Sequence, residues 1–251
     1  MESFESLIKK AEALVREGKI VEAMWVYDEA QEIKPDDLDL KSLRANFLAN
    51  LAAQGREWEY ISGVINSYLK KAYLLYKQGN FKPALEFLDK GINIAPNIPN
   101  LYGLKASICT KIRNFEEGVR CYKRVLEMDI TKEQRFSTLH SLGYLLTMLK
   151  KYDESIKFTN EALSLNPKDN TLWYNKGTAL QRCGKSKEAI KALDEGLSLN
   201  PQKSMKIKFL LNKGNAFSDL KKKQKAITCF NEILSIDPNN KTAKEMISKL
   251  S

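Results

Sequence analysis

Histidine and paired cysteines are the first things this sequence lacks. His140 is the only histidine, and the four cysteines are scattered without a C-x-x-C pair, at Cys109, Cys121, Cys183 and Cys229. A zinc site needs clustered histidine or cysteine ligands, and a disulfide framework needs an oxidising compartment for which the sequence carries no signal. We therefore expect reduced thiols packed within helices, and neither a metal site nor a cofactor.

Catalytic motifs are also missing. The chain contains no G-x-S-x-G, no phosphate-binding P-loop and no G-x-G-x-x-G. Paired carboxylates such as Glu116 and Glu117 are adjacent in an expected helix, so their side chains point in different directions and do not flank a substrate. We expect that the protein is not an enzyme.

Long apolar runs and a signal peptide are absent as well. Hydrophobic residues make up 43% and charged residues 29%, and no apolar stretch approaches the roughly 20 residues that span a bilayer. The start, MESFESLIKKAEALVREGK, lacks the basic flank, apolar centre and small-residue cleavage site of a signal peptide. These features predict an intracellular, cytoplasmic protein without a membrane segment.

Charge is distributed unevenly along the chain, whose net charge is +10. Residues 1–40 hold five Lys/Arg against eleven Asp/Glu, whereas residues 201–251 hold eleven against four. An acidic head and a basic tail could steer an acidic partner toward the C-terminal end, or favour head-to-tail association of copies. A solvated, lysine-rich surface without a charged partner accounts for the same counts.

What the chain does have is a repeating pattern, clearest in residues 172–201. With Trp173 taken as position 4 of a unit, similar units begin near Phe4, Ile65, Pro99, Phe136, Asn170 and Ile207, and the basic period is 34 residues. Position 4 is always large and apolar, and positions 8 and 20 are always small. Five of the seven prolines occupy position 32, namely Pro35, Pro96, Pro167, Pro201 and Pro238. Small residues allow helices to approach closely, and proline ends a helix.

Apolar residues within each unit recur at helical spacing, as do Ala189, Ile190, Leu193 and Leu197. With these helices and the period of 34 residues, the chain resembles the tetratricopeptide repeat family, whose unit is a helix-turn-helix. The resemblance implies an all-α, right-handed superhelical solenoid with a concave inner groove. Repeats are expected at residues 4–37, 65–98, 99–132, 136–169, 170–203 and 207–240, followed by a capping helix at 241–251.

The segment of residues 38–64 departs most from this pattern, because it has 27 residues in place of 34. We favour a degenerate repeat whose first helix covers Leu38–Ala53 and whose second helix is about two turns short. The alternative is an extra helix followed by a lengthened helix over Trp58–Lys77. In either arrangement the rings of Trp58 and Tyr60 are expected to pack rather than to form a site.

Two smaller departures concern the ends of helices. Ile130 stands where proline is expected, so we expect the second helix of that unit to run on or to turn differently. Lys221 and Lys223 replace the usual glycine and aromatic residue in the last unit, which predicts an atypical turn between its helices.

In the tetratricopeptide repeat family the first helix of each repeat lines the concave groove, and this resemblance assigns candidate peptide-binding residues. They are mostly aromatic, amide-bearing or cationic: Tyr73, Tyr76, Lys77, Lys111, His140, Tyr144, Tyr174, Asn175, Arg182, Lys208, Asn212 and Asn215. Asn175 and Asn212 both occupy position 6, where family members use an asparagine amide to pair with the backbone of an extended peptide. Tyrosines beside them offer flat, amphipathic contact area.

The expected function is a non-catalytic protein-interaction scaffold that holds a peptide segment or a partner helix in its groove. The residue set with which chaperone-binding relatives clamp an acidic C-terminus is incomplete, because Leu211 stands where a cation is needed. Two alternatives stay open. The basic C-terminal half and its groove tyrosines could bind nucleic acid, although no regular base-reading pairs recur. Copies of the chain could also assemble head to tail.

Overall fold

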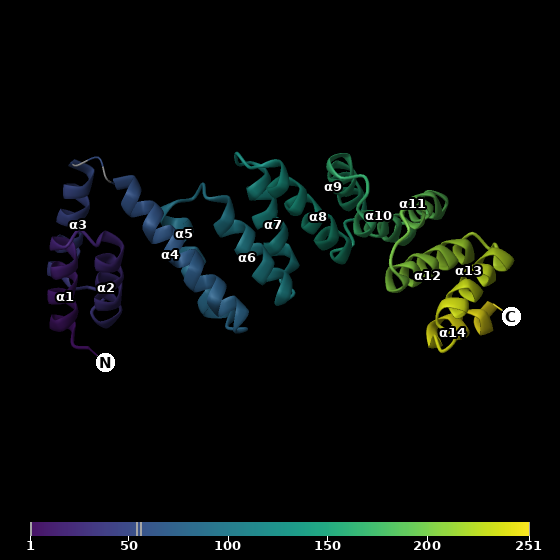
Figure 1. The fold of residues 1–251 in the computed structure, drawn as a ribbon, viewed down its shortest axis with the longest axis horizontal. Helices are drawn as coiled ribbons and strands as arrows, with labels where there is room; N and C mark the ends of the chain where they lie inside the picture. Colours follow the sequence, from purple (N-terminus) through teal and green to yellow (C-terminus); the bar gives the residue numbers. More distant parts are fainter. Residues whose placement is uncertain (1, 54, 56, 251) are drawn as a thin grey trace. The chain divides into compact units, whose positions relative to one another are not determined.

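Helices account for all the regular secondary structure in the described part of the chain, which is residues 2–53, 55 and 57–250 of the computed structural model (Figure 1). Fourteen helices lie within these residues, which confirms the all-α, helix-turn-helix expectation. The chain divides into two compact units, residues 1–104 and residues 105–251.

The first unit contains α1 (Phe4–Arg16), α2 (Ile20–Ile33), α3 (Leu38–Ala53), α4 (Glu57–Lys77), α5 (Phe81–Ile94) and the start of α6 (Pro99–Lys111). The second contains the end of α6, then α7 (Phe115–Leu126), α8 (Lys132–Met148), α9 (Tyr152–Leu165), α10 (Asn170–Arg182), α11 (Ser186–Ser198), α12 (Lys203–Asp219), α13 (Lys223–Ile236) and α14 (Lys241–Leu250). From α7 onward each helix packs against the next one along the chain. The final helix α14 covers the end of α13, and Ala243 is fully buried there.

Small residues lie where paired helices touch, as the pattern predicts. A Cβ atom added to Gly177 of α10 would collide with the side chain of Leu193 on α11, and one added to Gly214 of α12 would collide with the Phe230 ring on α13. Phe230 is fully buried. The absence of a side chain at position 8 therefore lets the two helices of a repeat approach closely.

The predicted helix ends are also present. Five helices end two or three residues before a proline at position 32, namely α2, α5, α9, α11 and α13. Position 15 of the six aligned units takes a left-handed conformation, with glycine at Gly18, Gly79 and Gly184 and other residues at Arg113, Lys150 and Lys221. The turn at Lys221 has the same hydrogen bonds as the turn at Gly184. The expectation of an atypical last turn was therefore wrong. Lys221 adopts the left-handed conformation that glycine adopts in the other turns, at a cost in backbone strain.

The favoured arrangement of residues 38–64 was wrong in one respect. α3 ends at Ala53 as expected, but no separate short helix follows, because α4 is one continuous helix over Glu57–Lys77. This is the lengthened helix of the alternative. Its Gly63 lies so close to Val21 of α2 that an added Cβ would collide with that side chain. Tight packing on α2 therefore accompanies the unbroken helix.

Two first helices of the second unit are longer than the pattern implies. α8 begins at Lys132 and α12 at Lys203, each four residues before its aligned unit starts. At α8 the Thr131 side chain accepts from the Gln134 backbone N–H (3.2 Å), and the Gln134 side chain accepts from the Thr131 N–H (3.0 Å). This reciprocal cap starts the helix early, and α7 stops at Leu126 without the proline that Ile130 replaces.

Candidate functional site

The first helices α8, α10 and α12 lie side by side in the second unit, since α10 contacts both neighbours. Eight of the predicted groove residues lie on these helices: His140, Tyr144, Tyr174, Asn175, Arg182, Lys208, Asn212 and Asn215. Lys208 is exposed, and so is the predicted residue Lys111 on α6. We call the surface formed by α8, α10 and α12 the first-helix surface.

A short hydrogen-bonded chain links α10 to α12 on the first-helix surface. The Asn212 side-chain amide donates to Thr178 Oγ1 (2.7 Å), and the Thr178 hydroxyl donates to the Tyr174 carbonyl oxygen (2.8 Å). Asn212 therefore already uses one donor within the protein. The predicted peptide-binding role of Asn212 therefore applies only to the second N–H donor and the oxygen of its side-chain amide.

Two other asparagines on this surface have unused hydrogen-bonding groups. The Asn215 Oδ1 atom is buried and accepts no hydrogen bond within the described part of the protein. Asn175 is only 9% exposed, and none of its side-chain atoms bonds to a described residue. Buried polar groups are nearly always paired, so these groups are candidates for a hydrogen bond with a water molecule or a ligand that gains access to them.

The aromatic residues of the surface differ in what they expose. Tyr174 packs edge-to-face against Phe209, with ring centroids 5.7 Å apart, and Phe209 is fully buried. The His140 ring lies 6.3 Å from that of Phe136, so it packs along its own helix. Tyr144 is 42% exposed and offers the largest free aromatic area of the three.

Lysines of the second unit are partly engaged. Lys213 pairs with Asp194 (2.6 Å), and the Lys176 ammonium lies 5.1 Å from the Trp173 ring centroid. Burial lowers the pKa of Lys176, although Glu188 opposes that shift. Two of the predicted groove cations on these helices, Arg182 and Lys208, are exposed to solvent.

The remaining predicted residues lie on α4 in the first unit. Tyr73 and Tyr76 have ring centroids 6.3 Å apart, and the Tyr76 ring lies 6.2 Å from that of Phe81. The Lys77 ammonium lies 5.4 Å from the Tyr73 ring centroid, and Tyr73 is 48% exposed. These contacts form a small aromatic ladder topped by a cation.

A hollow between α1 and α3 was missed from the sequence. It measures about 460 Å³ and is lined by apolar Phe4, Ile8 and Leu43, by four acidic residues and by two lysines, Lys9 and Lys34. The acidic residues are Glu5, Glu12, Asp37 and Asp39, and Glu5 pairs with Lys34 (3.6 Å). Glu5, Ile8 and Glu12 occupy groove positions of the unit at 4–37, so the same mapping applied to that unit would have found them.

The described residues contain neither a metal-binding cluster nor a membrane-spanning helix. No group of three or more His, Cys, Asp or Glu side chains there could hold a metal ion. Burial, and next the nearby Glu117 carboxylate, raises the pKa of the Cys121 thiol to about 12, so this thiol stays protonated and unreactive. None of the described helices is long and apolar enough to cross a membrane.

Comparison with protein-family models gives matches to the tetratricopeptide repeat at residues 65–98, 99–129, 136–169, 171–203 and 207–240. Together these cover more than half of the sequence. The chain belongs to the tetratricopeptide repeat family. No family match covers residues 1–64, so the tetratricopeptide repeat at 4–37 remains a prediction supported by the α1 and α2 hairpin.

Solved structures of other tetratricopeptide repeat proteins share the fold. YrrB, described as having an unusual peptide-binding site, is 18% identical, with 71% of this chain and 89% of that chain covered and a TM-score of 0.62. MamA from Desulfovibrio magneticus RS-1 is 16% identical, with 71% and 97% covered and a TM-score of 0.64. Comparison with curated proteins found no match.

Proposed function

We propose that this protein is a non-catalytic scaffold that binds an extended segment of another protein on the first-helix surface. Membership of the tetratricopeptide repeat family implies protein–protein interaction. The observation that carries the finer proposal is the pair of unused amides, Asn175 and Asn215, on adjacent helices. A peptide backbone offers a donor and an acceptor at each residue, and an asparagine amide matches both.

The surroundings of the two amides favour an extended ligand over a compact one. Tyr144 on α8, Arg182 on α10 and Lys208 on α12 are all exposed, so one extended segment can contact all three helices. YrrB, whose fold is similar, has a peptide-binding site of its own. Arg182 and Lys208 suit a segment that carries acidic residues beside the amide contacts.

The proposal is tested with peptides selected from a random display library against the purified chain. Affinity is then measured by calorimetry for Asn175→Ala combined with Asn215→Ala. Loss of two amide hydrogen bonds should weaken binding by about tenfold or more. Asn160→Ala is the matched control, because Asn160 is exposed on the second helix α9. Selected peptides that bind the double variant as tightly as the parent protein would contradict the assignment.

Self-association is a second candidate, favoured by the acidic hollow between α1 and α3. Glu5, Glu12 and Asp37 line it, and the C-terminal residues 201–251 are strongly basic. A basic tail in the hollow of the next copy would give an open, heterologous chain of molecules. Light scattering over a salt series measures it: the mass should fall as salt increases, and a constant monomer mass at low salt excludes it.

A further inference from the structure

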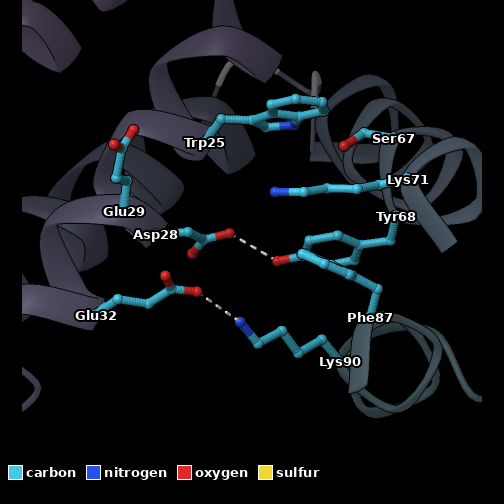
Figure 2. A pocket seen from close by; sticks show the side chains of 9 residues that line it. All are labelled: Trp25, Asp28, Glu29, Glu32, Ser67, Tyr68, Lys71, Phe87 and Lys90. Carbon is cyan, nitrogen blue, oxygen red and sulfur yellow. Dashed lines mark hydrogen bonds and ion pairs between the residues drawn. The ribbon is translucent and has the colours of Figure 1, made fainter. Parts of the chain in front are cut away.

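A pocket of about 310 Å³ lies within the first unit, between α2 on one side and α4 and α5 on the other (Figure 2). We call it the Trp25 pocket. Because α3 leads into the lengthened α4 without a separate second helix, α2 faces α4 and α5 directly. A full repeat would place another helix between them, so the pocket follows from the shortened segment 38–64.

Most charged groups around the Trp25 pocket are already paired. Asp28 accepts from the Tyr68 hydroxyl (2.6 Å) and pairs with Arg44 (2.9 Å). Glu32 pairs with Lys90 at 3.3 Å (Figure 2). These contacts tie α2 to its neighbours, and they leave a mouth in which carboxylates outnumber cations.

Two polar groups in the pocket have no such partner. Ser67 is 8% exposed, and its Oγ atom accepts or donates no hydrogen bond within the described residues. Figure 2 shows this hydroxyl pointing into the pocket near Trp25. Glu29 lines the pocket and forms no ion pair with any described residue. An unpaired buried hydroxyl costs stability unless a ligand or water satisfies it.

The Lys71 ammonium group occupies the space between the aromatic walls. It lies 4.4 Å from the Phe87 ring centroid and 5.9 Å from that of Trp25. Lys71 has no carboxylate partner among the described residues, and its side chain is exposed at the pocket mouth. The aromatic faces attract a cation electrostatically, so the protein holds its own lysine where an external cation would fit.

We propose that the Trp25 pocket binds an organic cation, the lysine or arginine side chain of a partner segment, in place of the Lys71 ammonium. The incoming cation lies between the rings of Trp25 and Phe87. The Ser67 hydroxyl and the Glu29 carboxylate rotate to accept its hydrogen bonds, since neither group bonds to the Lys71 ammonium in the structure. Lys71 swings into solvent, which an exposed lysine does at little cost. An anion is disfavoured, since Glu29 remains without a cation among the described residues and Lys90 is already paired with Glu32.

The experiment uses the full chain labelled with 5-fluorotryptophan. Because the chain has three tryptophans, the labelled protein gives three ¹⁹F resonances. The probes are two isosteric pairs, each a cation and a neutral compound. One pair is the peptide acetyl-Gly-Lys-Gly-amide and its analogue with 2-aminoheptanoic acid in place of lysine, and the other is choline and 3,3-dimethyl-1-butanol. The Trp25 resonance, assigned from Trp25→Phe, should shift saturably with the cations and not with the neutral compounds.

Three variants sharpen this test. Lys71→Met removes the internal ammonium group and should tighten cation binding about tenfold, because the internal cationic competitor is gone. Glu29→Gln should weaken it about threefold by removing a charge partner. Lys70→Met is the matched control, since it removes a neighbouring exposed lysine of α4, and it should leave affinity unchanged.

The outcomes are decisive in either direction. Weaker cation binding by Lys71→Met, equal binding of neutral isosteres, or no saturable shift with any probe would overturn the proposal. If choline binds and the lysine peptide does not, the ligand is a free ammonium compound, and its assignment as the side chain of a partner protein is overturned. Thermal unfolding by circular dichroism confirms that each variant is folded.

Discussion

The two units of this protein use the same helical pattern with different regularity. In the second unit, paired helices from α8 to α13 bury small residues at fixed positions, and the adjacent first helices form one polar surface. In the first unit, the shortened segment 38–64 produces a lengthened α4, and the Trp25 pocket lies beside α2. Regular spacing therefore stabilises a repeat, whereas an interrupted register creates space that a regular repeat would fill.

The largest effect that separates the two units should come from their large aromatic residues. Phe230→Ala removes a fully buried ring of the second unit, which should lower the free energy of unfolding by about 3–5 kcal/mol. Trp58→Ala in the first unit should change it by about 0.5 kcal/mol or less, because Trp58 is 66% exposed and the expectation that its ring packs was wrong. Urea denaturation followed by circular dichroism measures both. Equal losses would refute the packing difference.

The contact between α2 and α4 is tested at Gly63. Gly63→Ala should destabilise by about 1–3 kcal/mol, because the new methyl group would collide with Val21. Gly103→Ala in α6 is the matched control: nothing lies within 4 Å of an added Cβ there, so helix propensity should stabilise it by about 0.5–1 kcal/mol. If both substitutions stabilise the chain, α4 does not pack on α2 as described.

The shared turn geometry is tested by exchanging glycine and its replacements. Lys221→Gly should stabilise the second unit by about 1 kcal/mol, because the left-handed conformation (φ 57°) strains lysine. Gly184→Ala should destabilise it by a similar amount, since Gly184 has φ 82°. Melting temperatures of the two variants give the signs. A loss of stability in Lys221→Gly would show that the Lys221 side chain stabilises the turn by more free energy than its backbone strain costs.

The two lengthened first helices differ in how they begin. Thr131→Ala removes the reciprocal cap of α8 and should cost about 1 kcal/mol. Gln202 precedes α12 without capping it through its side chain, so Gln202→Ser should gain about 0.5–1 kcal/mol. Denaturant midpoints measure the pair, and equal shifts in one direction would contradict the assigned caps.

The smallest expected effect is on the stability of the protein at acidic pH. The Lys123 ammonium donates to Glu154 (2.7 Å) and holds the pKa of that carboxyl below its usual value. A lowered folded-state pKa contributes stability above the unfolded pKa that is lost as pH falls through the folded pKa. The advantage of the parent over Glu154→Gln should therefore be present near neutral pH and be lost as pH falls below the unfolded-state pKa and through the lowered folded-state pKa. A pH-independent difference would show that the ion pair is not its source.

The regular part of the fold could be predicted because its determinants are local. Proline at position 32 and small residues at position 20 act within one unit, so helix ends and buried faces follow from spacing alone. The continuity of α4 could not be predicted in this way. No residue between Glu57 and Val64 forbids or requires a break, and the contact of Gly63 with Val21 joins segments far apart in the sequence.

The candidate site could be predicted only as a set of helical positions. Spacing placed Asn175, Asn212 and Asn215 on first helices, but their availability depends on neighbouring repeats. Asn212 reaches Thr178 on the preceding first helix, and Asn175 is nearly covered. The Trp25 pocket had no sequence signal, because three helices contribute to it and its shape depends on α4.

The central claim is that unused amides of the first-helix surface bind a peptide backbone. The most direct measurement is the side-chain amide spectrum of ¹⁵N-labelled protein as a selected peptide is added. The account predicts saturable shifts of the Asn175 and Asn215 side-chain resonances, with that of Asn160 unchanged. Shifts confined to residues of the second helices α9, α11 and α13, with those of Asn175 and Asn215 unmoved, would contradict it.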